Sequence, residues 1–137
     1  MATYNKINSF VEAIAEKVHN LGADTLTLAL TTNANAPVAT NTVLANLTQI
    51  AYTNLSARAL TISSSSQTSG TYKLVLADLV LTASGAVATF RHVCMYNDTA
   101  TNDELISWWD YGSDVTLAAS ETFTFDADAT NGVLQLA

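Results

Sequence analysis

Three runs of sequence decide the fold: Gly70-Thr-Tyr-Lys-Leu-Val-Leu-Ala-Asp-Leu-Val-Leu-Thr-Ala-Ser-Gly85, Ala86-Val-Ala-Thr-Phe-Arg-His-Val-Cys-Met-Tyr-Asn-Asp98 and Glu104-Leu-Ile-Ser-Trp-Trp-Asp-Tyr-Gly112. They are rich in apolar, β-branched and aromatic residues, and Ser-Gly and Asn-Asp-Thr turn residues separate them. Such runs predict strands, and the short turns between them predict an antiparallel meander. We expect the rest of the chain to pack around these three strands.

The first run changes face along its length. Leu74 and Leu76 share one face of the expected strand, whereas Leu79 and Leu81 share the other, and the change falls at Asp78. Either the strand is buried on both faces, or a bulge at Asp78 carries it from one sheet to another.

The second and third runs each need cover on two sides. Residues 87–96 place large apolar side chains on both faces, which is typical of a central strand. Trp108 and Trp109 are adjacent, so they point to opposite faces of the third strand. One of them can enter the core, and the other requires a second layer or a partner molecule.

The remaining segments complete a mainly β chain. Residues 4–19 carry apolar side chains at spacings of three and four, which predicts one amphipathic helix whose apolar stripe is Ile7, Phe10, Val11, Ile14 and Val18. Residues 24–31 alternate Leu with Thr or Ala and predict a half-buried strand. Residues 32–57 form a long irregular segment, and the serine-rich residues 63–70 predict an exposed turn. We therefore predict a single domain over residues 1–137, an antiparallel β-sandwich or jelly-roll-like fold with an N-terminal amphipathic α-helix.

The composition narrows the classes of function. Hydrophobic residues make up 49% of the chain and charged residues only 12%, so hydroxyl and amide groups supply most of the polar surface. So few charges favour assembly with other subunits. The net charge is −7, and no Lys or Arg follows Arg91. This distribution argues against nucleic-acid binding, because phosphate contacts need clustered basic residues.

No segment predicts a targeting or membrane role. The N-terminus lacks the basic and apolar regions of a signal peptide, and no run approaches the length of a membrane span. The single Cys excludes an internal disulfide.

The residues with reactive side chains favour structural interpretations. His92 and Cys94 share one face of the central strand, and we interpret them as core residues rather than a nucleophilic pair or part of a zinc site. Residues 126–132 place oxygen ligands at alternating positions but lack a terminal bidentate Glu, so a polar turn is favoured over a calcium site. We predict no catalytic residue, no metal and no cofactor.

Two carbohydrate hypotheses stay open beside this interpretation. Asp103, Glu104, Asp110 and Asp114 could supply a carboxylate pair for glycoside hydrolysis. A carbohydrate-binding module would instead use Trp108 or Trp109 as a platform for a sugar ring.

Several short segments resemble small structural proteins encoded in the head modules of tailed bacteriophages. These segments are Tyr4-Asn-Lys-Ile-Asn-Ser-Phe-Val11, Ala36-Pro-Val-Ala-Thr-Asn-Thr-Val-Leu44, Ser69-Gly-Thr-Tyr-Lys-Leu-Val-Leu-Ala-Asp78, Tyr96-Asn-Asp98, Trp108-Trp-Asp-Tyr-Gly112, Glu121-Thr-Phe-Thr-Phe-Asp126 and Asn131-Gly-Val-Leu134. They are spread over nearly the whole chain.

The resemblance implies a virion component without enzymatic activity. We expect a capsid cement or decoration protein on the outer surface of the capsid, bound to the major capsid protein as a homotrimer at or near three-fold positions. A tail or neck component is the first alternative. The residues that we expect to contact partners are Tyr4, Pro37, Val38, Tyr52, Trp108 and Trp109.

Overall fold

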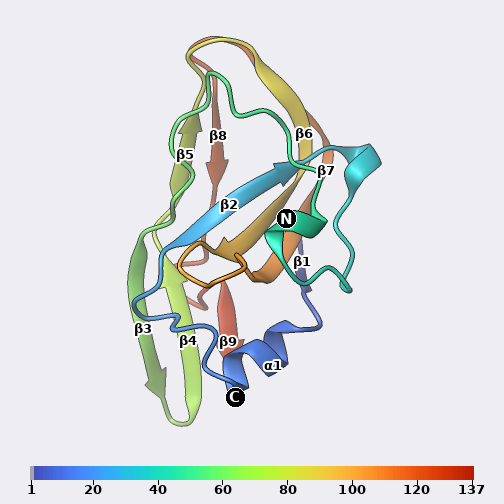
Figure 1. Ribbon diagram of the computed structural model, residues 1–137. Helices are drawn as coiled ribbons and strands as arrows, with labels where there is room; N and C mark the ends of the chain where they lie inside the picture. Colours follow the sequence, from blue (N-terminus) through green and yellow to red (C-terminus); the bar gives the residue numbers. More distant parts are fainter. Residues whose placement is uncertain (1) are drawn as a thin grey trace.

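The computed structural model describes residues 2–137 as a mainly β protein with antiparallel sheets and one short α-helix (Figure 1). The largest sheet has four strands in the order β1-β7-β6-β2. Their bounds are β1 Thr3–Lys6, β2 Leu26–Thr31, β6 Val87–Asn97 and β7 Leu105–Leu117. The predicted β-sandwich-like class with a single N-terminal helix is confirmed.

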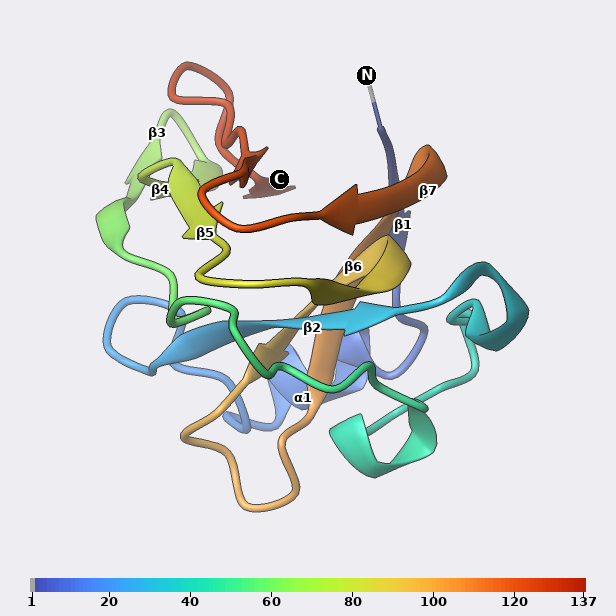
Figure 2. The ribbon, with the colours of Figure 1, turned by 90° about the horizontal axis from the view of Figure 1, so that it is seen from above.

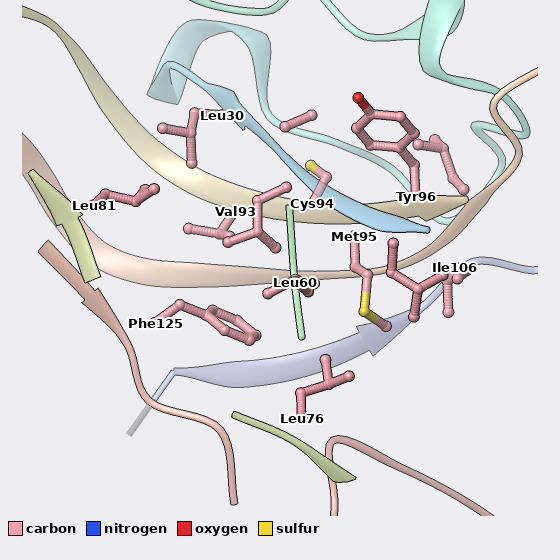
Figure 3. Close-up of a cluster of buried hydrophobic side chains, with 14 of the residues drawn as sticks. Leu30, Leu60, Leu76, Leu81, Val93, Cys94, Met95, Tyr96, Ile106 and Phe125 are labelled. Carbon is pink, nitrogen blue, oxygen red and sulfur yellow. The ribbon is translucent and has the colours of Figure 1, made fainter. Parts of the chain in front are cut away.

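Two smaller sheets form a second layer. One has the order β3-β4-β9, with β3 at Ile62–Thr68, β4 at Thr71–Leu76 and β9 at Leu134–Leu136. The other pairs β5 at Leu79–Thr82 with β8 at Thr122–Phe125. Val93 and Met95 of β6 lie on the side of the main sheet that meets this layer (Figure 3). The apolar core therefore lies between the two layers.

The change of face at Asp78 marks the point where the chain leaves one sheet for another. β4 belongs to the three-stranded sheet, and β5 belongs to the two-stranded sheet. The Asp78 carboxylate accepts a hydrogen bond from the Ala127 N–H at 2.8 Å, which ties the break to the segment after β8. Of the two alternatives, the structure shows the crossing from one sheet to another.

The expected meander is only partly present. β6 is the central strand, paired with β2 on one side and β7 on the other. However, β4 and β5 pair with β9 and β8 instead of β6, so the first run is not the neighbour of the second. β7 is the longest strand and continues to Leu117.

The long segment 32–57 covers the second face of the main sheet. It contains two short 3-10 turns, η1 Asn33–Asn35 and η2 Leu44–Asn46. The Ile50 N–H donates to the Leu30 carbonyl oxygen at 3.0 Å, which holds the segment on β2. Cys94 and Tyr96 lie on the side of β6 opposite Met95 (Figure 3). The prediction of a half-buried β2 is therefore wrong, because all six of its residues are buried.

The predicted helix over residues 4–19 is wrong in its extent. Residues Thr3–Lys6 form β1, and the helix α1 covers only Phe10–Ala15. Lys17 has a left-handed backbone with φ of 65°, which a continuing helix cannot contain. The helical pattern is local, whereas the partner of β1 is a strand about a hundred residues further along the chain. Phe10 is buried, but Val11 is 52% exposed although it belongs to the same predicted apolar stripe.

The serine-rich segment also differs from its prediction. Ile62–Thr68 forms β3 and pairs with β4 from Ile62↔Leu76 to Thr68↔Thr71. The turn is confined to Ser69 and Gly70, both at positive φ. β3 is an edge strand with exposed hydroxyl side chains, which keep that edge polar.

A buried polar cluster fixes the segment that follows α1. The Asn97 amide nitrogen donates to the Asp24 carboxylate at 2.6 Å and lies 3.1 Å from His19 Nδ1. The Asn97 side-chain oxygen accepts hydrogen bonds from the N–H groups of Thr99 and Ala100. This cluster holds the segment 19–24 against the β6–β7 connection.

Candidate protein-interaction surface

Tyr4 and Trp109, both predicted contact residues, lie together on the main sheet. They are direct partners in the β1–β7 register, so both side chains point to the same face. Their ring centroids are 5.7 Å apart in an edge-to-face arrangement. Phe125 of β8 packs on Trp109 in the same way, at 5.1 Å. Trp109 is thus held between the two layers.

A second set of aromatic contacts lies next to that between Trp109 and Phe125, two residues along β7 and β8. Tyr111, two residues further along β7, packs on Phe123 at 5.4 Å, and Phe123 packs on Phe90 at 5.1 Å. We call the two sets together the aromatic row; its members are Tyr4, Phe90, Trp109, Tyr111, Phe123 and Phe125. Tyr4 is 38% exposed and Tyr111 is 53% exposed. Aromatic side chains held in place by packing and open to solvent are the type that dominates binding at protein interfaces.

An irregularity in β7 places Tyr111 at the surface. His92↔Asp110 and Phe90↔Val115 are consecutive register pairs, so residues 111–114 lie opposite Arg91 alone. Gly112 has a φ of +94°, which favours glycine, and its N–H donates to the Asp110 carboxylate at 2.8 Å. Extra residues of this kind bend a strand and redirect its side chains.

An ion pair fixes the base of this irregularity. The Arg91 guanidinium donates two hydrogen bonds to the Asp110 carboxylate, at 2.8 and 3.1 Å. Arg91 and the Gly112 N–H lower the pKa of Asp110 to about 2. Asp110 is therefore ionised at neutral pH and committed to Arg91, an arrangement that suits a structural ion pair.

Trp108 lies on the opposite face of the sheet from Trp109. Its ring packs against His92 with centroids 5.8 Å apart. The Trp108 Nε1 atom is buried without a hydrogen-bond partner among the described residues. Trp108 is half-buried and its indole nitrogen is buried, so this chain itself supplies part of the cover that we expected for one of the two Trp residues.

The other predicted contact residues belong to segment 32–57. Pro37 is buried, whereas Val38 is 52% exposed. The Tyr52 hydroxyl accepts a hydrogen bond from the Leu30 N–H at 2.9 Å and donates one to Gln49 at 2.6 Å. The Arg58 guanidinium lies 3.6 Å from the centre of the Tyr52 ring. Tyr52 therefore fastens the segment to β2, and Val38 is the loop residue that offers a free apolar side chain.

A groove adjoins the exposed end of the row at Tyr4. It has a volume of about 420 Å³ and runs between β1, α1 and the C-terminal segment. Its lining includes Tyr4, Lys6, Phe10, Val11, Val133, Leu134 and Leu136. Tyr4 is the member of the aromatic row that also lines the groove.

Sequence reasoning missed Tyr111, Phe123 and Val11 as surface residues. Tyr111 could have been placed on the face of Trp109, because it lies two residues away, although alternation gives no sign of the irregularity in β7 that exposes its ring. Phe123 could not, because nothing local indicates that β8 lies beside β7. Val11 falls in the apolar stripe of the helix that the sequence pattern predicts over residues 4–19, so the pattern predicts it to be buried.

The candidates for a nucleophilic pair, a zinc site or a calcium site all lie in the core or in a turn. Cys94 is 1% exposed, and burial raises its pKa to about 12. His92 is also buried, and burial lowers its pKa. The Asp128 carboxylate accepts hydrogen bonds from Thr130 and Asn131, as expected for a polar turn. Within residues 2–137, no group of three or more His, Cys, Asp or Glu side chains is placed to hold a metal ion.

No protein-family model, curated protein or solved structure matches the chain. Across the same residues, no helix combines the length and the apolar character that crossing a bilayer requires. The functional interpretation rests on the residues of this chain and on the sequence resemblance described above.

Proposed function

We propose that the chain is a non-enzymatic virion structural protein of a tailed bacteriophage, a capsid cement or decoration protein. It binds the major capsid protein on the outer surface of the capsid and stabilises the shell. The observation that carries the proposal is the exposed part of the aromatic row, where Tyr4 and Tyr111 project from rings packed edge to face. The sequence resemblance to head-module proteins supports the same assignment.

The mechanism is the addition of many modest contacts. Each subunit bridges neighbouring capsomers, and association into a homotrimer lets three copies of the surface bind at once. Linked binding events of this kind raise the overall affinity without any new contact. The acidic second half of the chain is suited to a basic surface on the partner.

Co-sedimentation with capsids tests the proposal. The full chain is mixed with empty procapsids and with expanded shells of the phage that encodes it. We expect saturable binding to one of these forms, and a loss of about tenfold in affinity for the double variant Tyr4→Ser, Tyr111→Ser, since each exposed ring contributes at a contact. Val80→Ser is the matched control, because Val80 is 50% exposed but lies on the opposite face of β5 from the row.

Absence of binding to both shell forms would overturn the assignment. Binding to purified tails or necks instead would favour the alternative of a tail or neck component. Light scattering of the free protein tests the homotrimer, and a stable monomer at high concentration would count against it.

The carbohydrate-binding alternative has one observation in its favour. Tyr111 is exposed and packs on the ring of Phe123, whereas Trp109 packs against both Tyr4 and Phe125. A sugar platform on this surface would therefore use Tyr111 instead of the predicted Trp109. A glycan-array signal that Tyr111→Ala removes would support this alternative.

A further inference from the structure

The groove beside Tyr4 lies between the outermost strands of two sheets. Among residues 2–137, β1 is the last strand of the four-stranded sheet and pairs with β7 alone. Within the same residues, β9 is the last strand of the three-stranded sheet and pairs with β4 alone. Both strands lie toward the side of the molecule that is uppermost in Figure 2. The groove therefore has an unpaired strand edge in each of its two sheet walls.

An unpaired edge favours one kind of occupant. Its backbone N–H and C=O groups are free to pair with another extended chain, and proteins bind peptides by adding such a strand. β1 has four residues and β9 has three, so the pairing would involve a short segment. A volume of about 420 Å³ has room for one or two side chains of that segment.

The side chains of the groove define the chemistry of the occupant. Val11 is 52% exposed, and Leu136 is half-buried beside the buried Leu134, so the groove offers an incomplete apolar site. An apolar side chain from the occupant would complete it.

The groove lining carries one cationic side chain, in a chain whose net charge is negative. Lys6 is the one charged side chain in its lining, and it is exposed. Among residues 2–137, no carboxylate lies within ion-pair distance of the Lys6 ammonium, so Lys6 is free to pair with an anionic group. In a chain with a net charge of −7, this isolated cation selects for a carboxylate.

We infer that the groove between β1 and β9 binds an extended segment of a partner protein that carries a large apolar residue and an Asp or Glu two positions away. The segment adds a strand at the β1 edge, its apolar side chain lies against Val11 and Leu136, and its carboxylate pairs with Lys6. A spacing of two residues keeps both side chains on one face of the added strand. The inference rests on the proposed function for the identity of the partner, which would be the major capsid protein.

Selection from a random heptapeptide library displayed on filamentous phage tests the inference directly. With the full chain as target, we expect enrichment of peptides in which an apolar residue and an acidic residue are two positions apart. Lys6→Glu should exchange the acidic preference for Lys or Arg and weaken binding of a wild-type-selected synthetic peptide about tenfold. Val11→Glu should abolish the apolar preference. Lys17→Glu is the matched charge-reversal control and should leave both preferences unchanged.

Amide chemical shifts locate the bound peptide. We expect the largest changes at residues 3–6 and 134–136. Enrichment without this pattern, or an acidic preference that survives in Lys6→Glu, would overturn the inference. A dimer of the free protein that Val11→Glu dissociates would also overturn it, because a second copy would then fill the groove. The selection uses no capsids, so shell binding without peptide enrichment would overturn the inference and leave the proposed function intact.

Discussion

Replacement of Trp109 by Ala should cost the fold about 3 kcal/mol of unfolding free energy. Truncation of a fully buried aromatic residue costs about 3–5 kcal/mol. Trp109 is only half-buried, so the burial part of this cost falls to about 2 kcal/mol. The loss of its edge-to-face contacts with Tyr4 and Phe125 adds about 1 kcal/mol to the cost. The side chain closes the space between β7 and β8, so its removal weakens the contact between the two layers.

Thermal unfolding followed by circular dichroism measures this cost. A chain of 137 residues has an unfolding entropy of about 0.3 kcal/mol/K near its midpoint, so about 3 kcal/mol lowers Tm by about 10 °C. Tyr111→Ala is the matched control, because Tyr111 is 53% exposed and packs on Phe123 alone within the row. We expect it to lose about 1 kcal/mol, or about 3 °C. A Trp109→Ala loss no larger than that of Tyr111→Ala would refute the structural role assigned to Trp109.

Three further predictions concern buried groups and the backbone. Burial lowers the pKa of both His19 and His92, so the folded state binds fewer protons than the unfolded state. The free energy of unfolding should therefore be highest above about pH 7 and should fall as the pH drops below about 6.5. Urea midpoints between pH 7.5 and 5 test this, and an equally steep fall in His92→Gln would contradict the role of His92. Gly132→Ala should destabilise the fold by about 3 kcal/mol or more, because its φ is +78° and a Cβ would lie 2.5 Å from a backbone oxygen. Gly70→Ala, at φ of +87° with open space around it, should cost about 1 kcal/mol. Equal urea midpoints for the two variants would contradict this difference. Cys94 should react with iodoacetamide only after unfolding, because it is 1% exposed and its pKa is about 12, and rapid labelling of the native protein would contradict its burial.

Local alternation was enough to predict part of the fold. The change of face at Asp78 is visible in the sequence, because period-two alternation depends only on near neighbours, and the structure divides β4 from β5 at this residue. The same reasoning found β6 as a strand buried on both faces.

Long-range pairing explains the expectations that were wrong. Tyr4 fits a helical pattern, but its backbone pairs with Trp109 of β7. The serines of β3 have turn-like composition, but the hairpin with β4 fixes them as a strand. β2 reads as half-buried because the chain that covers its second face is an irregular segment with no periodicity of its own.

The sequence predicted some residues of the candidate surface but not their neighbours from β8. Tyr4 and Trp109 were identified from the sequence, and the structure brings them into contact. Phe125, which packs on Trp109, and Phe123, which packs on Tyr111, come from β8, whose position beside β7 depends on contacts that no local pattern encodes.

A cryo-electron microscopy reconstruction of decorated capsids tests the central claim most directly, namely that the exposed part of the aromatic row is the surface that binds the shell. We predict additional density on the outer capsid surface at or near three-fold positions, into which the chain fits with Tyr4 and Tyr111 against the major capsid protein. Shells that carry no additional density, or density in which both tyrosines face away from the shell into solvent, would contradict the claim.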